Sequence, residues 1–136
     1  MATKWTDEQK KVIETRHRNL LVSAAAGSGK TAVLVQRIIE RICDESHPVD
    51  IDRLLVVTFT NAAAGEMRER VQAAIAKRVE ENPDNTHLRR QEVLAGHAHI
   101  TTIDSFCLSV LREHFHDFPS DNQPVKCAAK KTCWQK

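Results

Sequence analysis

The apolar residues of this chain recur at two spacings, one typical of amphipathic helices and the other of buried strands. Two long helices are predicted over 31–43 and 62–81, because each range carries one apolar stripe at helical spacing. The stripes consist of Leu34, Val35, Ile38, Ile39 and Ile42 in the first range and of Met67, Val71, Ala74, Ile75 and Val79 in the second. Shorter helices are predicted over 86–94, closed by Gly96, and over 105–115. A further helix is predicted to follow Thr6 and run to Thr15, since Thr6 and Gln9 have the spacing of a capping box.

Three short apolar runs, at 19–23, 54–59 and 99–103, are predicted to be strands. The run 54–59 is apolar at both alternating sets of positions, as in a strand buried on both faces of a parallel sheet. Strands and helices alternate along the chain, so the predicted fold class is α/β, a parallel sheet with helices on its two faces. Prolines and scattered apolar residues predict an irregular tail over 118–136, which leaves 1–117 as the folded domain.

The composition is that of an ordinary globular protein, with 136 residues, 41% of them hydrophobic and 28% charged, and a net charge of +2. The longest apolar run, Leu54 to Val57, is too short to span a bilayer, and the polar first residues lack a signal-peptide core. We therefore expect a cytoplasmic protein without a membrane partner. Four cysteines without a C-x-x-C pair predict reduced thiols. A metal site is not favoured by the loosely spaced set His114, His116, Cys127 and Cys133.

The strongest chemical signal lies between a predicted strand and a predicted helix, in the run Ala24, Ala25, Ala26, Gly27, Ser28, Gly29, Lys30 and Thr31. The two glycines allow backbone N–H groups to converge on phosphate oxygens at the start of a helix. Lys30 would reach the β- and γ-phosphates, and the Thr31 hydroxyl would ligate Mg²⁺. The run therefore predicts a site for a nucleoside triphosphate. Ala24 stands where the general pattern has its first glycine.

The loop sequence with alanine at this position, together with Gln9 upstream, resembles that of superfamily-1 DNA helicases of the UvrD/Rep type. Residues 54–67 are similar to their motif Ia, and residues 101–107 to their next DNA-contacting motif. The combination most resembles the AddA chains of the bacterial AddAB helicase–nucleases, from Lys4 to His116. The resemblance implies a P-loop (RecA-like) ATP-binding domain, with ATP and Mg²⁺ as cofactors. It also implies two partners, DNA (single strands and duplex ends) and an AddB-like nuclease subunit, in recombinational repair of double-strand breaks.

The resemblance also implies roles for single residues. Gln9 would hydrogen-bond the adenine edge, whereas the pattern alone suits a helix cap with Thr6, and both alternatives stay open. The implied DNA contacts are Thr58, Phe59, Thr60, Asn61, Thr102, Ser105 and Phe106. The residues by themselves allow another interpretation, in which Thr60 and Asn61 cap the next helix and Phe59 fills the core. The charged run Arg68, Glu69 and Arg70 is predicted to be a solvated helix face.

ATP hydrolysis needs more than a phosphate loop, namely an acid that holds Mg²⁺ and a group that positions water. The helicases place an Asp-Glu pair after a strand, and no predicted strand here ends in one. Asp44-Glu45 follows a helix, and Asp104 is the one rival ligand. We therefore expect an amino-terminal piece of a longer protein, inactive by itself. The alternatives are a small P-loop kinase, with Asp104 on Mg²⁺ and Arg89 and Arg90 in a lid, and a non-enzymatic nucleotide-binding module.

Overall fold

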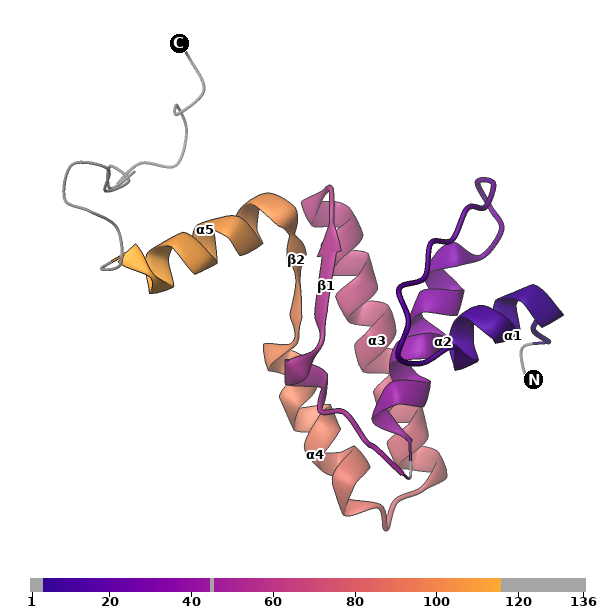
Figure 1. Ribbon diagram of the computed structural model, residues 1–136. Helices are drawn as coiled ribbons and strands as arrows, with labels where there is room; N and C mark the ends of the chain where they lie inside the picture. The colour runs from indigo at the N-terminus through magenta and orange to yellow at the C-terminus, as the bar shows by residue number, and fades with distance from the viewer. Residues whose placement is uncertain (1–3, 45, 116–136) are drawn as a thin grey trace. The chain divides into compact units, whose positions relative to one another are not determined.

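The computed structural model describes residues 4–44 and 46–115 (Figure 1). The chain divides into two compact units, residues 1–102 and 103–136, and each is described by itself. The first unit contains the helices α1 (Asp7–Glu14), α2 (Lys30–Ile42), α3 (Asn61–Glu81) and α4 (Thr86–Leu94), the strands β1 (Leu55–Thr58) and β2 (His99–Thr102), and the short 3₁₀ helices Ile51–Arg53 and Ala95–His97. The second unit contains α5 (Ile103–Glu113). The predicted tail, 118–136, lies outside the described residues.

The sheet consists of β1 and β2, which run parallel from the pair Leu55 and His99 to the pair Thr58 and Thr102. The connection between them passes through α3 and α4, and α3 packs against both strands (Figure 1). Ile100 is buried, whereas Leu55 and Val57 are 48% and 46% exposed. Since neighbouring side chains of a strand point to opposite faces, one face of the sheet is covered and the other is open. The prediction of a strand buried on both faces is therefore wrong for β1.

Residues 19–23 form no strand, which corrects the prediction made from their apolar run. A strand needs a neighbour for its backbone N–H and C=O groups. The described sheet contains β1 and β2 alone, and each pairs with the other. Without such a neighbour the segment is extended and exposed, to the extent that the side chain of Leu21 is 97% exposed.

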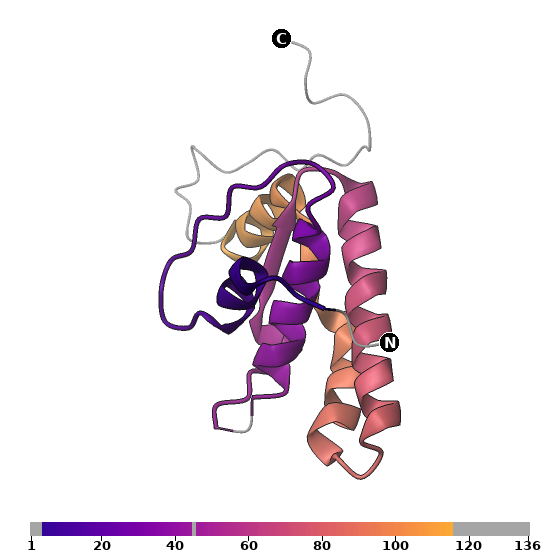
Figure 2. The ribbon, with the colours of Figure 1, turned by 90° about the vertical axis from the view of Figure 1, so that its right-hand side faces the viewer.

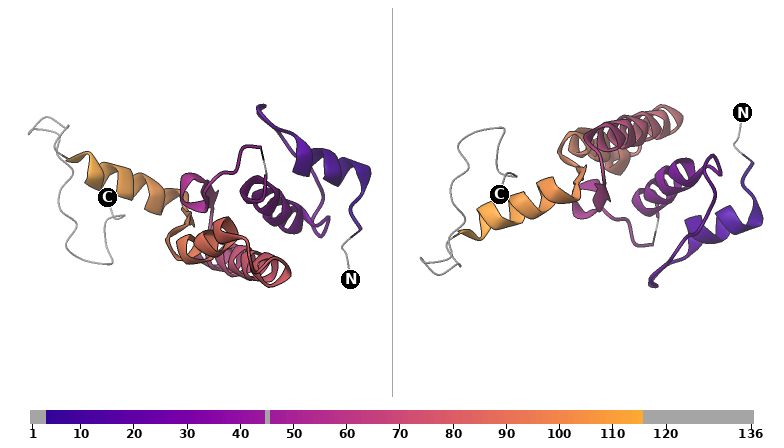
Figure 3. Two further views of the ribbon diagram at one scale, coloured as in Figure 1. Left: turned by 90° about the horizontal axis from the view of Figure 1, so that it is seen from below. Right: turned by 90° about the horizontal axis from the view of Figure 1, so that it is seen from above.

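The core of the first unit forms where α2, α3, α4 and the inner face of the sheet meet. Figures 2 and 3 show α2 beside α3, with α1 on the other side of α2. The buried members are Ile38, Ile39, Ile42, Ile51, Met67, Val71, Ile75, Leu88, Ala95 and Ile100. Most of the two predicted stripes is therefore buried as expected, but Leu34 of the first stripe is 38% exposed.

The predicted helices all form, with ends that lie within two residues of the expected ones. Side-chain caps explain three of these starts, since Thr6, Thr60 and Asn85 accept hydrogen bonds from the first turns of α1, α3 and α4. Among the described residues, no helix has the length and apolarity that a membrane crossing requires.

Candidate functional site

The loop that leads into α2 has the backbone conformation that its glycines allow. Gly27 and Gly29 have φ angles of 78° and 80°, in the left-handed region that other residues rarely adopt. Gly29 is also the N-cap of α2, and its carbonyl accepts the hydrogen bond from Val33 at 3.0 Å. The chain therefore turns at two glycines directly before a helix N-terminus, as a phosphate-binding loop requires.

Lys30, the first residue of α2, folds its side chain back along the loop. Its Nζ donates to the carbonyl oxygens of Ala24 and Ala25 at 2.7 and 2.6 Å. The ammonium group therefore lies inside the turn of the loop, where it is within reach of an anion that the loop holds. A phosphate oxygen would replace a neutral acceptor with a charged one, which is a stronger partner for an ammonium group.

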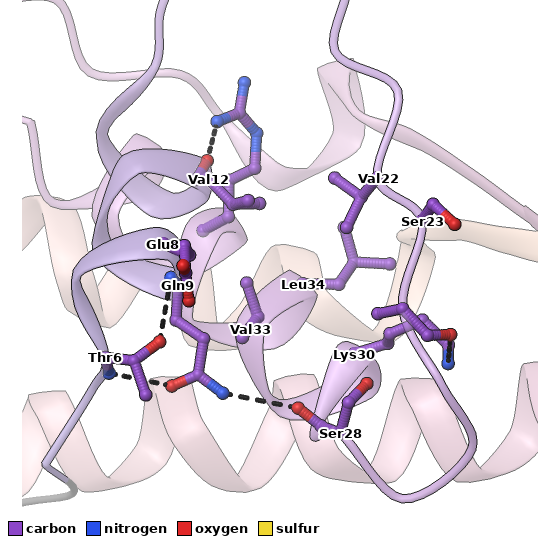
Figure 4. Close-up of a pocket in the computed structure, with 12 residues that line it drawn as sticks. Thr6, Glu8, Gln9, Val12, Val22, Ser23, Ser28, Lys30, Val33 and Leu34 are labelled. Carbon is purple, nitrogen blue, oxygen red and sulfur yellow. Dashed lines mark hydrogen bonds between the residues drawn. The ribbon is translucent and has the colours of Figure 1, made fainter.

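Gln9 lies between the start of α1 and the loop (Figure 4). Its Oε1 accepts from the backbone N–H of Thr6 at 3.0 Å, and its own N–H donates to the Thr6 hydroxyl at 3.3 Å. The capping box predicted from the sequence is therefore confirmed. The Nε2 of the same amide donates to the carbonyl of Ser28 at 3.3 Å, a contact that no sequence pattern indicated.

A pocket of about 480 Å³ lies among α1, the loop and α2, and Thr6, Gln9, Ser28 and Lys30 line it (Figure 4). The rest of its wall is largely apolar, with Val12, Val22, Val33 and Leu34. A largely apolar wall with a few polar and charged groups suits a ligand that has both an apolar part and a polar part.

Arg37 closes the pocket beside α1. Its guanidinium donates to the carbonyl of Val12. Partial burial, followed by the positive charges of Arg16 and Arg41, lowers the pKa of this guanidinium. Arginine nevertheless stays protonated in proteins, so Arg37 supplies a fixed positive charge at the pocket.

The predicted DNA contacts 58–61 lie at the carboxyl end of β1, a parallel strand, and at the start of α3. The Thr60 hydroxyl caps α3 by accepting from the Ala63 N–H at 3.1 Å, and Thr58 donates to the Thr60 carbonyl at 3.0 Å. Helix capping by Thr60 is therefore confirmed. Phe59 is 93% exposed, which excludes the prediction that it fills the core of the described unit. Asn61 is the first residue of α3 and is also exposed.

The remaining predicted DNA contacts fall in both units. Thr102 is the last residue of β2 and is buried. Ser105 and Phe106 lie on α5 in the second unit. The structure therefore does not bring these three residues together as one described site.

Two residues with structural roles escaped the sequence analysis. Arg68 is not simply part of a solvated face, because its Nη2 donates to the Ile100 carbonyl of β2 at 2.6 Å. Gln91 is fully buried, with Oε1 accepting from the Ile51 N–H at 2.8 Å and Nε2 donating to Asp50 at 2.6 Å. A glutamine on the buried face of a predicted helix was the available signal for the second contact.

Comparison with known protein families defines the class of this chain. The family described as UvrD/REP helicase N-terminal domain matches residues 5–134. The chain therefore belongs to the UvrD/REP helicase family. The match extends past Phe118, where the irregular tail is predicted to begin, and that domain boundary stays a prediction.

Individual relatives show which members of this family the chain resembles. The chain is 67% identical over 119 residues to AddA of Lachnoclostridium phytofermentans, one of the subunits of an ATP-dependent helicase/nuclease, and the match covers 88% of this chain and 9% of that protein. Proteins of the same name are 64% identical in Clostridioides difficile, over 83% of this chain and 9% of the relative, and 62% identical in Clostridium beijerinckii, over 88% and 10%. The resemblance to AddA is confirmed. The chain spans about a tenth of the length of these relatives.

The kinase alternative gains no support from these observations. Of the two arginines predicted for its lid, Arg89 and Arg90, the second forms an ion pair with Asp50 at 3.2 Å. Its metal ligand, Asp104, lies on α5 in the second unit.

Proposed function

We propose that this chain is the amino-terminal ATP- and DNA-binding segment of an ATP-dependent DNA helicase/nuclease, with a P-loop fold of the RecA-like type. The observation that carries the proposal is the loop before α2, where two glycines turn the chain, Lys30 lies along the turn and Gln9 contacts Ser28. The family match and the names of the relatives support the same function.

In this proposal the residues of the loop, from Ala24 to Thr31, hold the phosphates of ATP. The positive φ angles at Gly27 and Gly29 support it, because a Cβ would be strained at both positions. Thr31 would ligate Mg²⁺ through its hydroxyl, and the ion would neutralise charge on the β- and γ-phosphates. Gln9 would contact the adenine edge, and it keeps one N–H and one lone pair for that purpose.

Single-stranded DNA would cross the carboxyl ends of the two parallel strands, where ligands bind in open α/β sheets. The exposed ring of Phe59 supports this placement, since base stacking needs an aromatic face open to solvent. Thr58, Thr60 and Asn61 would position the phosphate backbone, and Thr102, Ser105 and Phe106 would be further DNA contacts. The longer protein would unwind and degrade DNA ends during recombinational repair. The relatives' names describe one of several subunits, which favours an AddB-like protein as its partner.

The binding of adenosine compounds with different numbers of phosphates tests this proposal. The full 136-residue chain would be titrated with ATP, ADP, AMP and adenosine in the presence of Mg²⁺. We expect ATP to bind at least tenfold more tightly than AMP or adenosine, because the loop and Lys30 contact the phosphates. Adenosine that binds as tightly as ATP would show that the pocket does not use the phosphate loop.

A further inference from the structure

The Gln9 amide joins the first helix to the phosphate loop. Oε1 accepts from Thr6 on one side, and Nε2 donates to the Ser28 carbonyl on the other (Figure 4). Of these two side-chain contacts, only the one with Thr6 belongs to the capping box. The second contact links Gln9 to a residue far along the chain, in the middle of Gly27-Ser28-Gly29.

The contact with Ser28 fixes the orientation of one peptide group in the loop. The C=O and N–H of a trans peptide point in opposite directions, and none of the described peptide bonds is cis. A Ser28 carbonyl directed at Gln9 therefore turns the Gly29 N–H away from Gln9. The amide lies close to this peptide, since a Cβ at Gly29 would stand 3.6 Å from the Gln9 Nε2.

This peptide is the part of the loop that most needs a tether. Glycines stand on both sides of Ser28, and glycine restricts backbone rotation less than any other residue. The Gly29 N–H is one of the backbone donors that would face phosphate at the start of α2. A hydrogen bond that holds the peptide in one orientation lowers the ordering that phosphate binding would otherwise require.

We propose that Gln9 is a positioning residue for the triphosphate group and that Thr6 positions Gln9. The proposal rests on the function proposed above and extends it. A residue that is expected to contact the adenine base would also determine how tightly the loop binds phosphate. The two roles do not compete for the same N–H group or the same lone pair. The amide has two N–H donors and two lone pairs on Oε1, and the contacts with Thr6 and Ser28 use one of each.

A ligand without a base separates the two roles of Gln9. The full 136-residue chain and its variants would be titrated calorimetrically with inorganic tripolyphosphate, ATP and GTP, each with Mg²⁺. We expect Gln9→Ala to weaken tripolyphosphate binding by about threefold to tenfold, the loss typical of one hydrogen bond. A loss of the base contact alone would weaken ATP binding and leave tripolyphosphate binding unchanged.

Two further variants test the part played by Thr6. Thr6→Val removes the hydroxyl that accepts from the backbone N–H of Gln9 and thereby weakens the cap of α1 that holds Gln9 in place. This variant should therefore also weaken tripolyphosphate binding, whereas Thr6→Ser should restore the parent affinity. Glu14→Gly is the matched control, because it lowers helix propensity at the exposed end of α1 and leaves the Gln9 contacts in place. Irreversibly misfolded molecules would lower the number of binding sites per chain, whereas reversible unfolding would raise the apparent dissociation constant. Circular dichroism and urea denaturation of each variant therefore check that the folded state is fully populated under the titration conditions.

Lys30→Ala distinguishes failure of this inference from failure of the proposed function. If Lys30→Ala weakens tripolyphosphate binding and Gln9→Ala does not, the loop binds phosphate and the positioning role of Gln9 is wrong. If neither variant changes the affinity for tripolyphosphate or ATP, the phosphate loop itself is not the site, and both proposals fall.

Discussion

At the residue scale, the polar side chains of the site already have hydrogen-bond partners within the protein. The Lys30 ammonium donates to two loop carbonyls, and the Thr60 hydroxyl caps α3. Binding of phosphate or DNA would replace these partners, so the net gain in binding free energy is smaller than the number of new contacts suggests. The contribution of Lys30 comes from the charge of its new acceptor, because hydrogen bonds between charged groups are the stronger ones.

Phe59 is the residue whose exposure most favours a DNA contact. Its ring is 93% exposed, so Phe59→Ala should leave the free energy of unfolding nearly unchanged. We expect the affinity for a labelled single-stranded oligonucleotide to fall about tenfold, because stacking contributes about 1–3 kcal/mol per base. Fluorescence anisotropy measures this affinity. Val93→Ala is a suitable control, since Val93 is also exposed but lies on α4. Equal DNA affinity for Phe59→Ala and the parent chain would contradict the assignment.

The cysteines of the two units should differ in reactivity. Burial raises the pKa of the Cys43 thiol, so a smaller share of it is the reactive thiolate near pH 8. Cys107 is exposed on α5. We expect iodoacetamide to label Cys107 faster than Cys43 in the native protein and at similar rates in urea. Peptide mass mapping over time measures both rates, and faster labelling of Cys43 in the native protein would be the contrary result.

At the element scale, the helices could be predicted from the sequence because their stripes and caps are local. Thr6 and Thr60 are confirmed as the caps that the sequence predicts, and Asn85, directly before the helix predicted over 86–94, caps that helix as well. The segment 19–23 could not be predicted correctly, because a strand depends on a neighbour that its own sequence does not specify. The same distinction applies to the candidate site. The capping contact of Gln9 is local and could be predicted, whereas its contact with Ser28 depends on the path of a distant loop and could not.

Gln91 is the element-scale contact with the clearest consequence for stability. Gln91→Leu should leave the buried Ile51 N–H without its acceptor, at a cost of about 1–3 kcal/mol in the free energy of unfolding. Urea denaturation followed by circular dichroism measures the change. Glu92→Leu on the same helix is the control and should cost little, because Glu92 is exposed. A Gln91→Leu variant as stable as the parent chain would show that water or a backbone shift satisfies Ile51.

At the scale of the whole molecule, binding and catalysis have different requirements. In the proposed function the loop before α2 holds phosphate, but binding the ground state of a substrate does not by itself accelerate a reaction. Neither strand of the described residues, β1 or β2, is followed by the Asp-Glu pair that the resemblance implies. An arginine finger, where a helicase has one, alone raises the rate of hydrolysis by a factor of about 10³ to 10⁵.

We therefore predict that the 136-residue chain alone shows no DNA-stimulated ATP hydrolysis. Steady-state phosphate release with single-stranded DNA present measures this activity, with Lys30→Ala as the control for contaminating ATPases. Turnover that DNA stimulates and that Lys30→Ala abolishes would contradict the prediction. It would mean that Asp104 or another acid of this chain supplies the missing Mg²⁺ ligand.

The affinity of Lys30→Ala for ATP tests the central claim most directly. In an equilibrium titration with Mg-ATP, we predict that this variant binds at least tenfold more weakly than the parent chain, a difference of about 1.4 kcal/mol. Lys77→Ala removes an exposed lysine from α3 and should bind ATP like the parent chain. Equal affinity of Lys30→Ala and the parent chain would contradict the claim that the loop before α2 is the nucleotide site.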